Sequence, residues 1–140
     1  MRRIDEIIIH CSATMEGRSF TVADIDLWHR QQGYKCIGYH YVITLDGKVY
    51  EGRNIDDVGA HCKGHNAHSI GICYIGGLDG QGEPKDTRTP QQKEAMTSLL
   101  YCLIGQFPDA TIHGHNEFSD KACPCFDVPE YLKEIGLDPL

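Results

Sequence analysis

The stretch from His113 to Cys123 places two imidazoles, a carboxylate, an amine and a thiol within eleven residues (His113, His115, Glu117, Lys121 and Cys123). Neutral imidazole nitrogens together with a thiolate form a mixed ligand set that zinc accepts in proteins. The spacing does not fit a zinc finger, which needs paired cysteines and paired histidines at short intervals. A metal site here therefore needs a ligand from another part of the chain, and this requirement constrains the fold.

His10 is the candidate for that ligand. It ends an isoleucine-rich run that predicts a buried strand, and such a strand delivers its last side chain to an edge of the sheet. A loop from the C-terminal third of the chain can reach it there. Three protein ligands with a fourth position left for water are typical of a catalytic zinc site. The residues alone leave open whether the second ligand is His113 or His115, and whether the third is Cys123 or Cys125.

The pattern of apolar residues predicts alternating strands and helices. Asp46-Gly47 between apolar stretches indicates a hairpin turn. Pro90 begins a long helix in which apolar residues recur at steps of three and four. Segment 76–89, rich in Gly, Asp and Pro, is predicted to be an exposed loop. The expected strands are 6–11, 39–44, 48–51, 69–75 and 111–113, and the expected helices are 21–32, 90–107 and 128–135. This order predicts the α/β fold class, a single domain with a mixed central β-sheet flanked by helices.

Length and charge narrow the class of protein and its partners. The 140 residues carry a formal net charge of -7, with acids spread along the chain, which argues against a nucleic-acid-binding surface. No apolar run is long enough to span a bilayer, and the first residues lack the pattern of a secretory signal. We therefore expect one domain over residues 1–140 and a monomer that is cytoplasmic as synthesised. Neither nucleic acid nor a membrane is expected as a partner.

The seven cysteines are an odd number, and without a secretory signal they favour reduced thiols over a disulfide framework. Free cysteine most often behaves as a small buried hydrophobic residue. We expect this of Cys11, Cys36, Cys62, Cys73 and Cys102.

Six short motifs lie along residues 4–135. They are His10-Cys11-Ser12-Ala13-Thr14, Gly38-Tyr39-His40, Asp46-Gly47 with Glu51-Gly52-Arg53, Gly59-Ala60-His61 with Gly64 and Asn66, Ser69-Ile70-Gly71, and Lys121-Ala122-Cys123-Pro124. In this order they resemble the zinc-dependent N-acetylmuramoyl-L-alanine amidases, most closely the small phage lysozyme type, in a superfamily that includes the peptidoglycan recognition proteins. The resemblance implies the fold of that superfamily. It also implies hydrolysis of the amide bond between the lactyl group of N-acetylmuramic acid and L-alanine in peptidoglycan.

The resemblance implies a role for each metal ligand and catalytic residue. One Zn²⁺ per chain is bound by His10, His115 and Cys123, because the family places its ligand histidine eight residues before the cysteine of the Ala-Cys-Pro triplet. Tyr39 lies beside the zinc-bound water, where we favour orientation and hydrogen bonding over full proton abstraction. Lys121 faces the reacting carbonyl oxygen.

For several further residues, the correspondence to the family motifs is less specific. His61 and Asn66 correspond to a loop that lines the substrate groove in the family, although hydrogen bonds that shape the loop are an equal alternative. Glu117 is expected to orient a ligand or to cap a turn. Cys125 and His113 are expected outside the ligand set.

Three other interpretations compete with the amidase. A non-catalytic peptidoglycan- or muropeptide-binding protein of the same fold is disfavoured by the presence of Cys123 and Tyr39. A structural zinc or redox protein is disfavoured because a second close thiol pair is missing. Some phage relatives bind RNA polymerase through a basic tail ahead of the first strand, and that tail is largely absent here. The setting stays open among an endolysin, a muropeptide-recycling enzyme and a bacteriolytic enzyme that reaches the cell wall after release or export.

Overall fold

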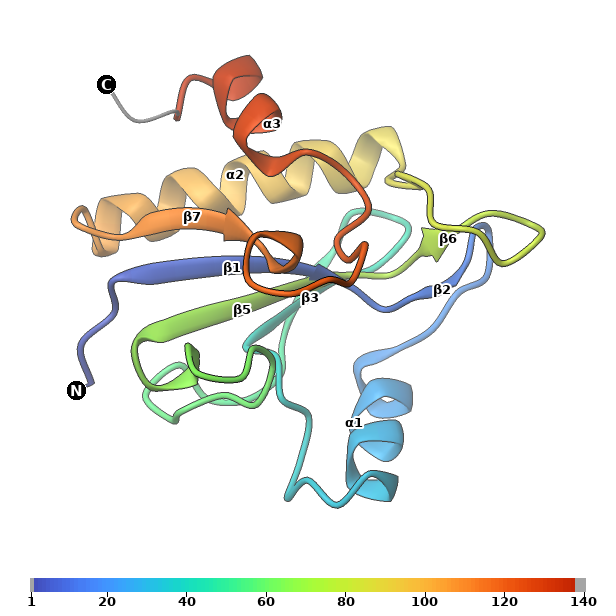
Figure 1. Ribbon diagram of the computed structural model, residues 1–140, viewed down its shortest axis with the longest axis horizontal. Helices are drawn as coiled ribbons and strands as arrows, with labels where there is room; N and C mark the ends of the chain where they lie inside the picture. Colours follow the sequence, from blue (N-terminus) through green and yellow to red (C-terminus); the bar gives the residue numbers. More distant parts are fainter. Residues whose placement is uncertain (1, 138–140) are drawn as a thin grey trace.

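A five-stranded sheet forms the centre of the computed structural model, which describes residues 2–137 (Figure 1). Its strands are β1 (Glu6–Cys11), β3 (Tyr41–Ile43), β4 (Val49–Glu51), β5 (Ser69–Tyr74) and β7 (Thr111–Gly114). Their order across the sheet is β4-β3-β5-β1-β7. Strand β1 is parallel to β5 and β7, β3 is parallel to β5, and only the hairpin of β3 and β4 is antiparallel among these pairs. The predicted mixed sheet is confirmed.

Strand β1 lies inside the sheet because its residues suit burial on both faces. Ile7, Ile8 and Ile9 are fully buried, as expected for a strand that is paired on both sides in a sheet covered by helices. Side chains alternate between the two faces along a strand, so Ile7 and Ile9 face one way while Ile8 and His10 face the other. The alternation therefore places His10 on the face opposite to the larger hydrophobic cluster, to which Ile7 and Ile9 belong.

Helices cover both faces of the sheet (Figure 1). Helices α2 (Pro90–Gln106) and α3 (Val128–Ile135) bury Met96, Leu100 and Leu132 against one face. Helix α1 (Val22–Gln31) buries Ile25 against the other face. All three helices lie where the sequence predicts them, and their first turns explain why they begin there. Thr21 and Thr89 accept hydrogen bonds as N-caps of α1 and α2, and both complete a capping box.

Segment 76–89 differs from the exposed loop that its composition predicts. It contains β6 (Gly77–Leu78), which pairs with β2 (Thr14–Met15) in a second, two-stranded sheet. Gly76 and Gly77 are buried, and the backbone N–H of Gly77 donates to Oγ1 of Thr87 at 2.8 Å. The prediction is wrong at this end of the segment because two-residue strands carry no readable periodicity.

The cysteines are buried less uniformly than expected. Cys11, Cys62 and Cys73 are buried, whereas Cys36 is partly exposed and Cys102 is exposed on α2. The prediction for Cys102 is wrong because the buried stripe of α2 runs through Met96, Leu100 and Leu103, and Cys102 lies off that stripe. All seven cysteines are free thiols.

Within residues 2–137, none of the helices combines the length and the apolar character needed to cross a bilayer.

Candidate metal centre

The carboxyl ends of two neighbouring parallel strands bring the three predicted ligands together. His10 lies near the end of β1, and His115 begins the short 3₁₀ helix η2 (His115–Glu117) directly after β7. Cys123 follows in the next loop. The ligand atoms of the three side chains all lie within 4.8 Å of one another. Nδ1 of His10 is 3.8 Å from Sγ of Cys123, and the ring centroids of His10 and His115 are 4.6 Å apart.

The 3.8 Å between Nδ1 of His10 and Sγ of Cys123 fits a zinc ion bound by both atoms. With Zn–N bonds of about 2.0–2.1 Å and a Zn–S bond of about 2.3 Å, tetrahedral geometry puts ligand atoms roughly 3.3–3.8 Å apart. Imidazole nitrogen and thiolate sulfur are also ligand types that zinc favours. His10, His115 and Cys123 thus have both the spacing and the chemistry to hold zinc.

The turn after β7 separates His115 from His113. His113 bonds to Oγ1 of Thr111 at 2.7 Å and to Oε1 of Glu117 at 3.0 Å, and it packs beside Phe118. The other carboxylate oxygen of Glu117 accepts the backbone N–H of Gly114 at 2.6 Å. Glu117 therefore ties the turn to the end of β7, with His113 held outside the cluster that contains His115.

The loop of Cys123 is anchored to the sheet at the sulfur itself and at the next residue, Pro124. The buried hydroxyl of Tyr74 donates to the carbonyl of Pro124 at 2.6 Å, and the backbone N–H of Cys11 points at Sγ of Cys123 at 3.2 Å. This N–H contact holds the sulfur beside the end of β1. Cys125 faces elsewhere, with its Sγ 3.8 Å from Sγ of Cys11.

Burial keeps the ligand histidines neutral. It lowers the pKa of His10 well below its ordinary value, and the nearby rings of His61 and His115 add to this effect. Burial and the ammonium of Lys121 lower the pKa of His115 as well. Neutral imidazole is the form that binds a metal, so both rings are ready to do so near pH 7.

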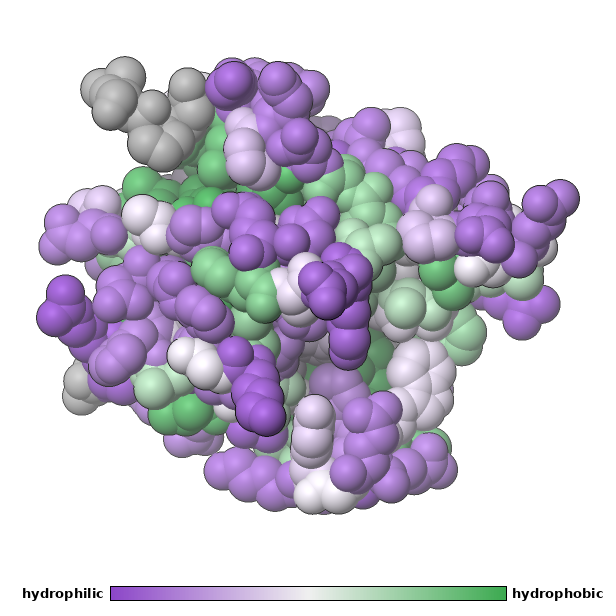
Figure 2. Space-filling model, viewed as in Figure 1, coloured by the Kyte–Doolittle hydropathy of each residue, from purple (hydrophilic) through white to green (hydrophobic). Residues whose placement is uncertain are grey.

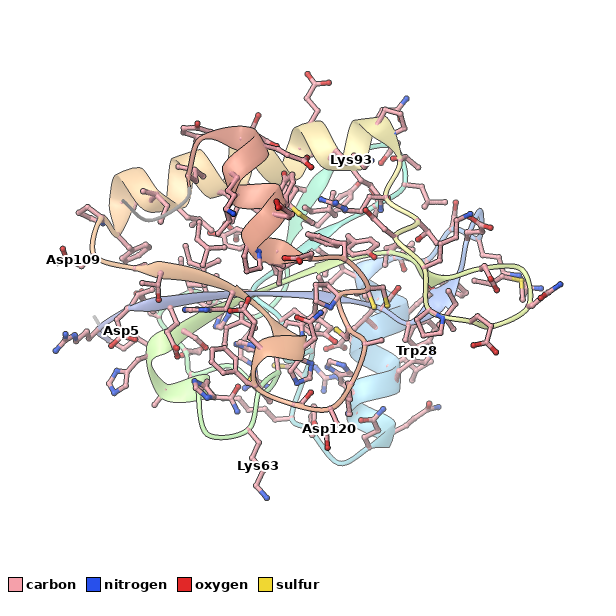
Figure 3. All side chains as sticks on the ribbon, turned by 45° about the horizontal axis from the view of Figure 1, so that its top comes forward. Asp5, Trp28, Lys63, Lys93, Asp109 and Asp120 are labelled. Atoms are coloured by element: carbon pink, nitrogen blue, oxygen red, sulfur yellow. The ribbon has the colours of Figure 1, made fainter. Side chains whose placement is uncertain are left out.

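A cavity of about 340 Å³ opens beside the ligands. One wall comes from α1 and the segment after it, with Trp28, His29 and Tyr34; Lys121 lines the opposite side. In Figure 3, Trp28 and Asp120 are labelled on the two segments that flank this cavity. In Figure 2, the hollow above α1 has hydrophilic residues on its left and pale to hydrophobic residues on its right. The cavity therefore gives a substrate direct access from the surface to the three ligands.

Both predicted catalytic side chains line this cavity. The ring of Tyr39 lies 5.1 Å from that of His10, measured between centroids, and 5.2 Å from that of His29. Burial raises the pKa of Tyr39 well above its ordinary value, so its phenol is protonated at neutral pH. The exposed Lys121 lies close enough for its charge to lower the pKa of both ligand histidines.

His61 and Asn66 are placed differently from each other. His61 lines the cavity, but its Nδ1 is 2.8 Å from Nε2 of His10 and its Nε2 is 3.1 Å from Oγ of Ser69. Asn66 is not among the residues that line the cavity. Its side-chain oxygen accepts the backbone N–H groups of His61 and Cys62, both at 2.9 Å, so Asn66 shapes the loop.

One wall residue of the cavity, His29, is not predicted from the sequence. Its Nδ1 accepts the backbone N–H of Gly38 at 2.8 Å, which fixes the ring against the segment that leads to Tyr39. The only sequence signal is its position beside Trp28 on a helix whose apolar face is turned to the sheet. That position alone does not distinguish a cavity residue from an exposed one.

Comparisons with known proteins show the family of this chain. The family described as N-acetylmuramoyl-L-alanine amidase matches residues 1–126. The endolysin of Klebsiella phage KP32 is 42% identical over 132 residues, which cover 94% of this chain and 87% of the phage protein.

Two solved structures extend the agreement to the fold. The N-acetylmuramoyl-L-alanine amidase LysC from Clostridium intestinale has a TM-score of 0.84 at 27% identity, covering 98% of this chain and 88% of LysC. A mutant of Drosophila PGRP-LB in complex with tracheal cytotoxin has a TM-score of 0.75 at 25% identity, covering 89% of this chain and 76% of that one. With a family match over residues 1–126, the chain belongs to the N-acetylmuramoyl-L-alanine amidases and hydrolyses the amide bond between N-acetylmuramic acid and L-alanine in peptidoglycan.

Proposed function

We propose that this amidase works with one zinc ion held by His10, His115 and Cys123. The observation that carries the proposal is the set of three ligand atoms within 4.8 Å of one another at the edge of an open cavity. Three protein ligands leave a coordination position for water or substrate, which is typical of catalytic zinc. Zinc held there supplies a Lewis acid that activates a water molecule near neutral pH and polarises the scissile carbonyl.

Lys121 is proposed to stabilise negative charge on the carbonyl oxygen of the substrate. Its ammonium is on the exposed side of the cavity and acts electrostatically on both ligand histidines, so a carbonyl bound beside them lies within its field. Loss of one comparable donor in other hydrolases costs about 3 kcal/mol of transition-state stabilisation.

Tyr39 is proposed to orient the attacking water by hydrogen bonding. A phenol whose pKa is raised by burial holds its proton at neutral pH and is a poor general base. The same proton can be donated to an oxygen atom in the cavity, which keeps that atom in one orientation relative to the substrate.

The substrate is proposed to be peptidoglycan or soluble muropeptides bound in the cavity between α1 and the Cys123 loop. The PGRP-LB structure with tracheal cytotoxin, a muropeptide, supports a substrate of this class. The phage endolysin among the relatives supports a bacteriolytic role on the cell wall, reached after release or export from the cytoplasm. We further propose that the catalytic domain extends over residues 1–140 and acts as a monomer.

Digestion of two substrates tests the reaction and its setting. Purified protein is incubated separately with intact sacculi and with soluble muropeptides, and the released ends are identified by mass spectrometry. Free L-alanine amino termini together with intact glycan are expected. Cleavage within the glycan or between two amino acids of the stem would refute the proposed bond.

Metal analysis tests the ligand set. About one zinc per chain is expected, with loss of both zinc and activity in His10→Ala, His115→Ala and Cys123→Ser. Cys125→Ser is the matched control, because its sulfur faces Cys11. If Cys125→Ser loses zinc while Cys123→Ser keeps it, the thiol assignment is wrong.

Two further variants separate catalysis from metal binding. Tyr39→Phe and Lys121→Ala are expected to keep zinc and fold while losing turnover, mainly in kcat. Turnover at the parent rate in both variants would show that neither side chain acts on the reacting groups.

A further inference from the structure

The imidazole of His61 forms a bridge between a metal ligand and the sheet. Its Nδ1 lies 2.8 Å from Nε2 of His10, and its Nε2 lies 3.1 Å from Oγ of Ser69. The rings of His61 and His10 are nearly perpendicular, with centroids 4.9 Å apart. Both nitrogens of His61 are therefore engaged within the protein, although the ring borders the cavity.

Two glycines leave room for this ring, Gly71 in the sheet and Gly59 in the loop before His61. A Cβ atom added to Gly71 on β5 would lie 2.7 Å from Cγ and Cδ2 of His61, which is too close for any side chain. A Cβ at Gly59 would lie 2.8 Å from Cδ2 of the same ring. In the register of β1 and β5, Gly71 is opposite Ile8, two residues before His10 and on the same face of the sheet. The absence of side chains at these positions lets the His61 ring lie against the strands and reach His10.

The backbone around His61 is held as well. The N–H of His61 donates to the side-chain oxygen of Asn66 at 2.9 Å, and the N–H of Ala60 donates to the carbonyl of Gly38 at 3.1 Å. Ser69, the partner at the far end of the ring, is fully buried at the start of β5. His61 is thus held at its backbone N–H, on one face of its ring and at both ring nitrogens.

The direction of the hydrogen bonds follows from the ligand atom. Nδ1 of His10 faces Cys123, so a metal at this site takes the lone pair of Nδ1 and leaves the ring proton on Nε2. That Nε2–H donates to Nδ1 of His61, whose own proton is then on Nε2 and donates to the hydroxyl oxygen of Ser69. Each donor in the series meets one acceptor, and a single tautomer of each ring satisfies all contacts.

We propose that His61 is a positioning residue, which holds the His10 ring in the tautomer and orientation needed for metal binding and is itself held by Ser69. This role replaces the substrate contact that the sequence resemblance implies for His61, and it rests on the proposed zinc site. Partners of this kind orient metal ligands, and their loss typically weakens metal affinity by about 10–100-fold.

Zinc affinity tests the role, because a residue that only contacts substrate does not change it. Affinity is measured by competition with a chromophoric chelator, and the cobalt-substituted protein reports the ligand geometry through its visible absorption. His61→Leu keeps the bulk of the ring and removes the acceptor, so we expect zinc affinity to fall about 10–100-fold with a changed cobalt spectrum. His61→Asn restores an acceptor near the position of Nδ1, and we expect it to recover part of the loss. His68→Ala, an exposed histidine of the same loop, is the control and is expected to match the parent.

The outcomes separate this proposal from the proposed function. A parent protein without zinc affinity refutes the zinc mechanism itself. If the parent binds zinc, the His61→Leu protein tests the positioning role. A folded His61→Leu protein with parental zinc affinity and a raised KM for muropeptide refutes that role and supports the substrate contact. If His61→Leu does not fold, Ser69→Ala decides, because it removes only the far partner of the ring. Parental zinc affinity and cobalt spectrum in that variant overturn the proposal, and a weaker affinity supports it.

Discussion

Replacing His40 with asparagine should make the fold less sensitive to acid. His40 is buried, its Nδ1 accepts the backbone N–H of Gly71 at 3.0 Å, and its Nε2–H donates to the carbonyl of Asp57 at 2.9 Å. A proton added at Nδ1 would break the bond to Gly71 and place a positive charge beside the guanidinium of Arg2. Burial is the main cause that lowers the pKa of His40 to about 4, and the charges of Arg2 and Arg53 add to it.

The size of the effect follows from the difference between the pKa of His40 in the folded state and the pKa of histidine in the unfolded state. An unfolded histidine titrates near pH 6.5, so between about pH 7 and pH 4 the unfolded chain binds a proton that the folded chain does not. The free energy of unfolding therefore falls as the pH falls through this range and levels off below it. From pH 7 to pH 5, His40 alone removes about 2 kcal/mol.

Urea unfolding at pH 7 and pH 5 measures this difference. His40→Asn keeps an acceptor near Nδ1 for the Gly71 N–H but does not titrate. Its stability should fall by about 2 kcal/mol less than that of the parent between the two pH values, whatever its absolute stability. Contributions of the metal and of other histidines are common to both proteins and cancel. Equal losses in the two proteins would refute the reasoning.

Three other predictions follow from contacts around the site. Hydrogen peroxide should join Cys11 to Cys125, whose sulfur atoms are 3.8 Å apart; two thiols and one peroxide give a disulfide and two waters. The reaction should be slow, because a side-chain hydrogen bond with Cys123 raises the pKa of the Cys11 thiol and burial raises the pKa of the Cys125 thiol. Peptide mapping that finds either sulfur joined elsewhere would contradict this prediction. Tyr74→Phe leaves the buried carbonyl of Pro124 without its donor, so we expect the free energy of unfolding in urea to fall by about 1–3 kcal/mol. Zinc binding measured by chelator competition should also weaken. Unchanged values in both assays would show that this hydrogen bond does not anchor the loop. Asn66→Ala should lose about 1–3 kcal/mol in the same unfolding assay because two backbone N–H groups lose their acceptor, while Asn66→Asp should lose less.

The parts of the fold that the sequence predicts are those with a long local pattern. The isoleucines before His10 and the stepwise apolar residues after Pro90 extend over enough residues to identify β1 and α2. Strands β2 and β6 have two residues each, so their pairing depends on where the rest of the chain places them. Composition alone therefore suggests a loop at Gly77.

The site is predictable only in part for a related reason. Residue chemistry identifies histidine and cysteine ligands, but the choice of Cys123 over Cys125 needed the resemblance to a family, since the two thiols are two residues apart. The structure separates them, with only Cys123 near Nδ1 of His10. The contact of His61 with His10 joins residues 51 positions apart, and no local pattern encodes it. In retrospect, its one sequence signal is the pair of glycines at positions 59 and 71.

The proposed zinc ligands lie far apart in the sequence, and this affects the stage of synthesis at which the site can form. His10 and Cys123 are separated by 113 positions, so a nascent chain displays the first ligand long before the last one is translated. A site assembled from such distant residues does not exist in the unfolded chain, and the free energy of zinc binding is then also free energy of folding. Peptides that end before Cys123 lack one of the three proposed ligands, so the proposed zinc mechanism predicts that truncated translation products are inactive toward peptidoglycan. The proposed mechanism thereby confines hydrolytic activity to chains in which the segment containing Cys123 has been made and has docked beside β1.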